Sequence, residues 1–286
     1  PNDFNVAENW QGGVKATSDD EIMCMAGAGA ILYGLDQTST GGGTAGGFEG
    51  FSVEEGFANN IGGTDDAALT MLLSEDKVRL QGTGYITLDL KASAVAPAIY
   101  DTYAASAGSY GLKLAGTAMT TVNVYKGVVG IGVEPDDTTT SLTNLNVNYI
   151  SSQSGDSNVT IGSGVTISGH ATNAIATVNM NGGVVTSKGA DIATVTIGNG
   201  TLVLSDDAAI STAVTMNNGR IFHDSSGTVT LATLNGGTYD ATRTANAKTI
   251  STLKINSGTF RRDPGDTTVT TFSNPDTPTE LTVSKI

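Results

Sequence analysis

The chain contains little cysteine, and this shortage excludes several classes of protein. Cys24 is the one cysteine in 286 residues. An intrachain disulfide and a thiolate metal cluster both need more than one cysteine, so neither can form. The neighbours of Cys24 are apolar, with Met23 and Met25 on either side. This context predicts a buried, unreactive thiol.

Basic residues and long apolar runs are also scarce. Lys and Arg number 14 against 28 Asp and Glu, which gives a formal net charge of −14. The densest basic cluster is the pair Arg261 and Arg262, whereas nucleic-acid-binding surfaces carry many clustered cations. No apolar run approaches the roughly 18 residues of a membrane span, and residues 1–5 lack the basic and apolar regions of a secretory signal. We expect no nucleic-acid partner, no membrane partner and no signal peptide.

Glycine, in contrast, occupies 37 positions, and between residues 157 and 260 it recurs at nearly constant spacing. Successive anchor glycines are separated by 19, 17, 19, 18 and 21 residues. The anchors are Gly164, Gly183, Gly200, Gly219, Gly237 and Gly258. A repeat of this length is typical of a solenoid, in which each repeat stacks on its neighbours.

Apolar residues keep fixed offsets from these glycines. Five residues before the anchors come Val159, Val178, Val195, Val214, Ala232 and Leu253. Three residues before them come Ile161, Met180, Ile197, Met216, Leu234 and Ile255. Two residues after the later anchors come Val185, Leu202, Ile221, Tyr239 and Phe260. Because a gap of two residues is the strand period, each repeat predicts short strands with apolar side chains facing inward.

Asparagine and glycine share one corner of the repeat. The corner sequences are Asn-Gly-Gly at 181–183 and 235–237, Asn-Asn-Gly at 217–219, Asn-Ser-Gly at 256–258 and the variant Gly-Asn-Gly at 198–200. Both residue types tolerate the positive φ that tight corners need. Stacked about 4.8 Å apart, the asparagines are expected to hydrogen-bond to one another as a ladder. Leucine-rich and calcium-binding nonapeptide repeats fit worse, because their Leu series and recurrent Asp are absent.

We therefore predict an all-β chain that forms a parallel β-helix (β-solenoid) with a less regular β-rich N-terminal half. Residues 1–140 are expected to form this N-terminal region, residues 141–262 the regular solenoid and residues 263–286 a C-terminal cap. Strands expected before the regular repeat are 21–25, 77–80, 85–90, 112–114, 121–125 and 142–147.

Residues 38–66 interrupt the strand pattern with many glycines, which predicts a long loop. Phe48, Phe51 and Phe57 lie in this segment. They either pack over the open end of the solenoid or contact a partner, because aromatic residues exposed on loops often mark interfaces. Together with Trp10, the only tryptophan, they are the candidate partner-binding residues.

No catalytic or metal-binding constellation is evident in the sequence. His170 and His223 lie about three repeats apart, roughly 14 Å along the axis, so they cannot share a metal ion. Asp206, Asp224 and Asp263 are the only candidate carboxylates for a glycan-cleaving site, and roles in turns are the more frequent use of such residues. We expect a protein that is not an enzyme, with no catalytic residue, no cofactor and no metal.

Several segments resemble β-helix proteins of tailed bacteriophages. They are Trp-Gln-Gly-Gly at residues 10–13, Leu-Tyr-Gly-Leu-Asp-Gln at 32–37 and Asn-Gly-Gly-Thr at 235–238. The resemblance covers much of the chain and extends to virion-associated proteins and, more loosely, to capsid decoration (cement) proteins, head fibres and tailspikes. It implies a structural virion component, commonly a homotrimer, and supplies no catalytic residues.

The expected function is that of a homotrimeric decoration protein on the major capsid lattice. The expected partners are the major capsid protein, or another virion protein, and further copies of this chain. The expected location is the virion, after assembly in the host cytoplasm. The alternative is a tailspike or fibre protein that binds, or binds and cleaves, host surface glycans. The N-terminal region is expected to attach to the particle, because the aromatic residues of the 38–66 segment lie in it.

Overall fold

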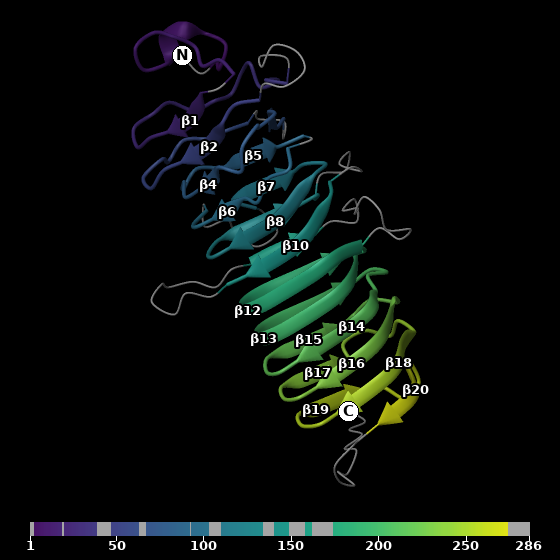
Figure 1. Cartoon of the computed structure of the whole chain (residues 1–286). Helices are drawn as coiled ribbons and strands as arrows, with labels where there is room; N and C mark the ends of the chain where they lie inside the picture. The colour runs from purple at the N-terminus through teal and green to yellow at the C-terminus, as the bar shows by residue number, and fades with distance from the viewer. Residues whose placement is uncertain are drawn as a thin grey trace.

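The computed structural model describes residues 3–18, 20–38, 47–62, 67–91, 93–102, 110–133, 140–148, 158–161 and 174–273. Within these ranges the chain is all-β, as predicted. Twenty strands form one sheet with parallel pairing, and one short 3-10 helix, η1 (Ala7–Asn9), precedes them. The sheet curls into an elongated, β-solenoid-like body with β1 near one end and β20 at the other (Figure 1).

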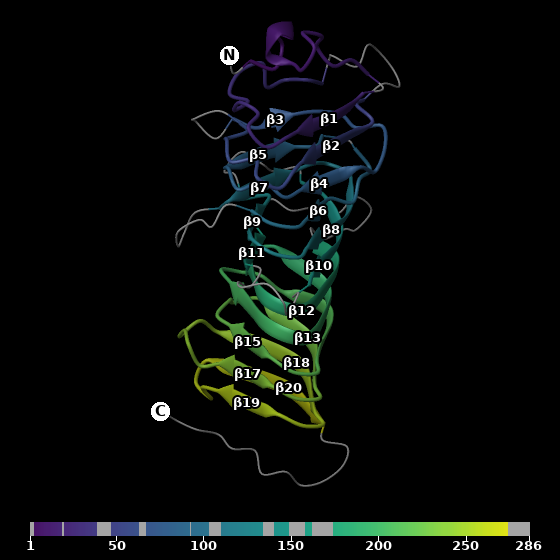
Figure 2. The same cartoon turned by 90° about the vertical axis from the view of Figure 1, so that its left-hand side faces the viewer.

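The strands lie in two stacks that run along the body (Figure 2). The first stack contains β1 (Glu21–Cys24), β2 (Gly50–Val53), β4 (Val78–Leu80), β6 (Ala98–Ile99), β8 (Met119–Val124), β10 (Leu142–Val147), β12 (Ala174–Lys188), β13 (Asp191–Ser205), β14 (Ile210–Met216), β16 (Thr228–Leu234), β18 (Lys248–Ile255) and β20 (Thr267–Ser273). The second stack contains β3 (Leu69–Thr70), β5 (Ile86–Asp89), β7 (Leu112–Ala115), β9 (Val128–Ile131), β11 (Asn158–Ile161), the second parts of β12 and β13, then β15 (Arg220–His223), β17 (Thr238–Ala241) and β19 (Thr259–Arg262). One strand from each stack makes up one rung.

The first stack is continuous across the boundary expected at residues 140 and 141. Strand β10 pairs with β8 on one side and with β12 on the other. At the far end β20 pairs with β18, so the described part of the expected cap adds a strand to the same stack. The division into domains stays a prediction, because strand pairing does not mark it.

The core of the later rungs is built from the apolar columns that the repeat predicts. Val178, Val195, Val214, Ala232 and Leu253 pair in succession along the first stack, and each is fully buried. The column that follows the corner is buried as well, with Tyr239 at 0% and Phe260 at 6% exposure. Full burial of one such side chain stabilises the fold by about 1.5–3 kcal/mol, so stacking like residues in register accounts for much of the cohesion between rungs.

The first repeat was assigned wrongly from the sequence. Val159 and Ile161 pair with Val185 and Ser187, in the second stack. Their expected places next to Val178 and Met180 belong instead to Leu145 and Val147 of β10. The error arises because the alternation Val-Thr-Ile looks the same in either stack, so it fixes the inward face without fixing the position in the rung. The anchor expected at Gly164 lies outside the described residues.

The asparagine ladder is confirmed. Asn235 donates its side-chain amide to Asn217 at 2.9 Å, and Asn256 donates to Asn235 at 2.7 Å. Nearer the N-terminal end of the body, the side-chain amide of Asn181 donates to that of Asn148 at 3.1 Å. These bonds run parallel to the body axis and link successive corners, where glycine alone offers no side chain.

All six strands expected before the regular repeat are present, with ends that differ by one or two residues or not at all. Four others were missed, and they are β2, β3, β6 and β9. The missed strands are two to four residues long, and β2 lies inside the glycine-rich segment that was expected to form a loop.

Candidate functional site at the N-terminal end

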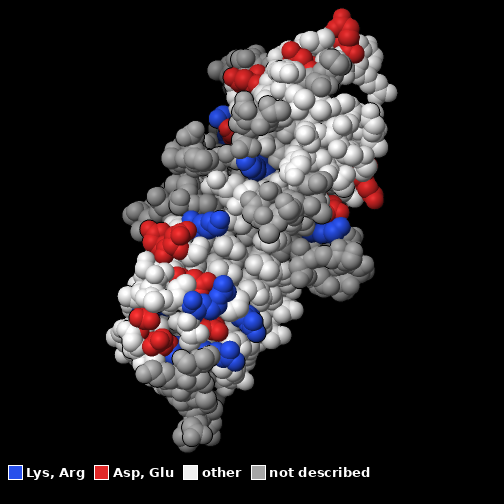
Figure 3. Space-filling model, turned by 180° about the vertical axis from the view of Figure 1, so that it is seen from behind, with Lys and Arg blue, Asp and Glu red and all other residues white. Residues whose placement is uncertain are grey.

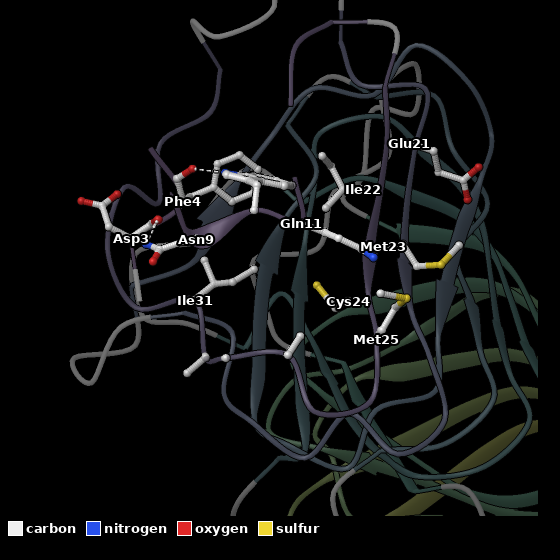
Figure 4. Close-up of a pocket in the computed structure, with 14 residues that line it drawn as sticks. Asp3, Phe4, Asn9, Gln11, Glu21, Ile22, Met23, Cys24, Met25 and Ile31 are labelled. Carbon is white, nitrogen blue, oxygen red and sulfur yellow. Dashed lines mark hydrogen bonds between the residues drawn. The ribbon is translucent and has the colours of Figure 1, made fainter. Parts of the chain in front are cut away.

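The N-terminal end of the first stack carries a pocket of about 360 Å³. Its walls come from residues 3–11, from β1 and from residues 28–31 (Figure 4). In the described part of the chain β1 pairs only with β2, so its other edge faces the N-terminal segment and this pocket. An end strand that lacks a second partner is where a solenoid can add contacts with another protein.

Two aromatic residues hold the N-terminal segment over the end of the stack. The indole nitrogen of Trp10 donates to the backbone oxygen of Phe4 at 2.9 Å. The two rings meet edge to face, with 4.7 Å between centroids and an angle of 88° between planes. Phe4 in turn contacts Phe48 at 5.9 Å between ring centroids, and both phenylalanines are buried. Trp10 is thus a fixed, partly buried wall of the pocket.

Strand β1 presents apolar side chains to both of its faces. Ile22 and Cys24 point into the core at 2% and 5% exposure. Met23 is 49% exposed and lines the pocket, as does Met25 at 40% exposure just after the strand. In Figure 4 the side chains of Glu21 and Met23 point to one side of β1, and those of Ile22 and Cys24 point to the other. Methionine packs against irregular surfaces readily because its side chain is unbranched and polarizable.

Exposed large apolar side chains gather at this end of the molecule. The described residues include seven of them, and five lie within the first 33 residues of the chain. The five are Val6, Val14, Met23, Met25 and Tyr33. Single exposed apolar residues need no explanation, whereas a group next to a pocket is typical of an interaction surface.

The three phenylalanines proposed for partner binding lie in the core instead. Phe48 is 2% exposed, and Phe51 and Phe57 are fully buried. Their rings offer no surface to a partner, so of the two expectations packing within the protein is the one that the structure bears out. Of the four proposed residues, the pocket contains Trp10, while Phe48 supports it through Phe4.

The glycine-rich segment is crowded, which corrects the expectation of a long loop over residues 38–66. Strand β2 lies inside it, with all four residues buried. A side chain on Gly47 would place Cβ 2.5 Å from the backbone oxygen of Leu72, and one on Gly50 would place it 2.6 Å from Cβ of Lys77. Glycine is needed there because neighbouring rungs approach closely. The alternation of Phe51 and Val53 was the signal that could have revealed the strand. Residues 39–46 and 63–66 lie outside the described residues.

Cys24 behaves as the sequence predicts. Its thiol is buried, and burial raises the pKa of Cys24 to about 12. The thiol is therefore neutral at physiological pH, and the thiolate is the form that acts as a nucleophile. Cys24 contributes packing beneath the pocket and no reactive group.

A second group of polar side chains is buried at the C-terminal end, inside the core. The hydroxyl of Tyr239 donates to Nδ1 of His223 at 2.9 Å, and Nε2 of His223 donates to the backbone oxygen of Gly227 at 3.1 Å. Burial lowers the pKa of His223 to about 4. Both ring nitrogens are thus occupied and the ring is neutral, which is the role of a hydrogen-bonded core histidine. His170 lies outside the described residues.

Lys248 is buried in the same region and closes a turn. Its ammonium group donates to the backbone oxygens of Thr244 at 2.6 Å and Asn246 at 2.7 Å. Burial lowers the pKa of Lys248, and the carboxylate of Asp266 acts in the opposite direction. Lys248 therefore stabilises the connection between β17 and β18.

The three candidate carboxylates have different surroundings. Asp206 adopts a positive φ of 58° in a turn, and Asp263 accepts a hydrogen bond from the backbone of Gly265 at 2.9 Å. Asp224 lies 3.4 Å from Arg243, and burial raises the pKa of Asp224. The negative charge of Asp240 also raises the pKa of Asp224, whereas the other two candidates have no such effect on it. The predicted turn roles hold for Asp206 and Asp263.

The described residues contain neither a candidate metal site nor a candidate membrane span. No three His, Cys, Asp or Glu side chains lie where they could hold a metal ion. No described helix has the length and apolar character needed to cross a bilayer. Comparisons with protein-family models, with curated proteins and with solved structures found no match to this chain.

Proposed function

We propose that the chain is a regular parallel β-helix that serves as a structural virion protein and docks through its N-terminal end. The observation that carries the proposal is the pocket of about 360 Å³ beneath Trp10, beside exposed Met23 and Met25. A rod of stacked rungs with exposed apolar side chains at one end is suited to stand on a surface and to present its sides to solvent. The partner in this proposal is the major capsid protein, as the resemblance to phage decoration proteins suggests.

The chemistry of the pocket defines what the partner must present. Its apolar walls suit an aliphatic or aromatic side chain inserted at the centre of the contact, and such buried anchors supply most of the binding energy in protein interfaces. Polar groups at the rim, among them Asp3, Asn9 and Glu21, would accept or donate hydrogen bonds around it.

Self-association into a homotrimer is the second part of the proposal. Copies that each carry a net charge of −14 repel one another, so contact between them is favoured where the surface is uncharged. Apart from Asp191 at the start of β13, the outward residues of the first stack from β8 through β16 meet this condition. They include Thr121, Asn123, Asn144, Asn146, Thr177, Asn179, Thr194, Thr196, Ala213, Thr215, Leu231 and Thr233. The mass of the protein in solution tests this part, and a stable monomer would contradict it.

We expect replacement of Met23 by aspartate to abolish attachment to the particle. A carboxylate in the docking surface must lose its hydration to enter the contact, and an unpaired buried charge costs several kcal/mol. Co-sedimentation of the purified protein with capsids that lack it measures the loss. A reduction of at least tenfold in bound protein is expected.

The matched control is Phe272→Asp, because Phe272 has nearly the same exposure, 47%, at the opposite end of the body. This variant should bind capsids like the unmodified protein. If both variants bind normally, or if Phe272→Asp alone loses binding, the N-terminal end is not the docking surface.

A further inference from the structure

A second hollow lies far from the N-terminal pocket, at the corner where the two stacks meet. It is a groove of about 530 Å³ that crosses three successive rungs. Its floor is the backbone of Gly182, Gly183, Gly200 and Gly219, and its walls carry the side chains of Asn199 and Arg220. The groove follows the glycine corners, where the rungs approach so closely that a side chain on Gly200 would place Cβ 2.7 Å from the backbone oxygen of Gly183. Three rungs at about 4.8 Å spacing give a length of roughly 10 Å, which is longer than a single small anion.

In the rung of Gly200 the ladder position is not occupied by asparagine. In the other repeats the asparagine stands two residues before the anchor glycine, where Asn181, Asn217 and Asn235 form their bonds. In this rung Gly198 takes that place and Asn199 follows it. The Asn199 side chain is exposed, lines the groove and has no hydrogen bond to any described residue. Its amide is available to a ligand as both donor and acceptor.

Arg220 is the charged residue of the groove. It opens β15, its side chain is exposed, and its strand neighbour is Thr201, which also lines the groove. No described carboxylate lies within ion-pair distance of Arg220, whereas Arg243 lies 3.4 Å from Asp224. Figure 3 shows Lys and Arg gathered on the C-terminal part of one face, with Asp and Glu among them. An unpaired guanidinium in a groove attracts an anionic group at short range.

An aromatic ring lies next to Arg220. The guanidinium carbon of Arg220 lies 5.3 Å from the ring centre of Phe222, and that of Arg243 lies 3.9 Å from it. Cations near an aromatic face are attracted to it, which holds both arginines beside the ring. The half-buried Phe222 thus adds an apolar surface next to the hydrogen-bonding groups. A few polar groups beside an apolar surface are the usual composition of a ligand site.

We propose that this groove binds an acidic saccharide, a sugar chain that carries carboxylate groups. Arg220 pairs with a carboxylate through two parallel N–H donors, the geometry in which arginine differs most from lysine. Asn199 and Thr201 exchange hydrogen bonds with sugar hydroxyls, and the bare glycine backbone lets the chain lie close. The site binds and does not cleave. It is separate from the N-terminal pocket, so it stands whether or not that pocket docks on a capsid.

Calorimetric titration with a short oligomer of galacturonic acid tests the proposal. Two control titrations use a galactose oligomer of the same length, which lacks the carboxylates, and inorganic phosphate. We expect the acidic oligomer to bind at least tenfold more tightly than the neutral one, the change that corresponds to about 1.4 kcal/mol. Phosphate should not displace the acidic oligomer at equal concentration.

Three variants locate the binding. Arg220→Gln should weaken it about tenfold or more and Asn199→Ala several-fold, because each removes one contact from an exposed position without altering the core. Arg79→Gln is the control, since Arg79 is exposed on β4 in the other half of the body. Equal binding of the neutral oligomer, displacement by phosphate, or equal losses in Arg79→Gln and Arg220→Gln would each overturn the proposal.

Discussion

Replacement of Gly237 by alanine should lower the free energy of unfolding by about 2–5 kcal/mol. Gly237 adopts a φ of 76°, where an alanine costs about 1–2 kcal/mol. The added Cβ would also stand 2.5 Å from the backbone oxygen of Gly219 in the preceding rung. Because that neighbour is backbone, the rungs must separate, and overpacking of this kind costs about 1–3 kcal/mol. Thermal denaturation measures the total, and hydrogen exchange in β15 and β17 shows where it acts.

Gly27→Ala separates the two contributions. Gly27 has a similar φ of 81°, but a Cβ there would meet no atom within 4 Å. The Gly27→Ala variant should therefore lose only the conformational contribution to the free energy of unfolding, about 1–2 kcal/mol. Equal losses in both variants would show that contact between rungs is not what requires glycine at the corner.

Stability should fall as the pH is lowered from about 6.5 to about 4, in part because of His223. The folded protein holds the pKa of His223 at about 4, below the value near 6.5 expected for the unfolded chain. Between these values the unfolded chain binds a proton that the folded core excludes, so protonation favours unfolding. The full contribution is about 3 kcal/mol, present above pH 6.5 and lost toward pH 4. Melting temperatures measured across this range test the slope.

The comparison variant is His223→Gln, whose amide can still donate toward Gly227 but does not titrate. This variant is expected to be less stable at every pH. The quantity to compare is therefore the slope of melting temperature against pH, not the melting temperature itself. Asp191 and Asp224 act in the opposite direction, because burial raises the pKa of both carboxyls and favours the folded state as they become protonated. A slope unchanged by His223→Gln would mean that other groups cause the acid sensitivity.

The later rungs were predicted well because their signals are local and repeated. The inward positions of Val195 and Val214 follow from a period of two. The ladder of Asn217, Asn235 and Asn256 follows from their common position two residues before an anchor glycine. The same local signal failed at Val159 and Ile161. Alternation identifies which face of a strand is buried, but it does not identify which strand lies beside it.

The prediction of a long loop over the glycine-rich segment was wrong for a related reason. Glycine is used both where the chain is unconstrained and where two backbones come very close, and its frequency does not distinguish these cases. Contact of Gly47 and Gly50 with the next rung decides between them. The aromatic residues of that segment were expected either to pack over the open end of the solenoid or to contact a partner, and they lie in the core.

The amino-acid order alone predicted the all-β class, the repeat, the inward columns and the glycine corners. Each of these features depends on residues that are close together in the sequence. Only the tertiary structure decided which surfaces remain open. Met23 and Met25 became exposed pocket residues because the stack ends at β1. Asn199 and Arg220 line one groove because adjacent rungs pair Thr201 with Arg220, 19 positions further along the chain. Binding surfaces in a solenoid depend on where stacking stops and on what neighbouring rungs leave unfilled. Both are properties of packing between rungs that a single repeat does not contain.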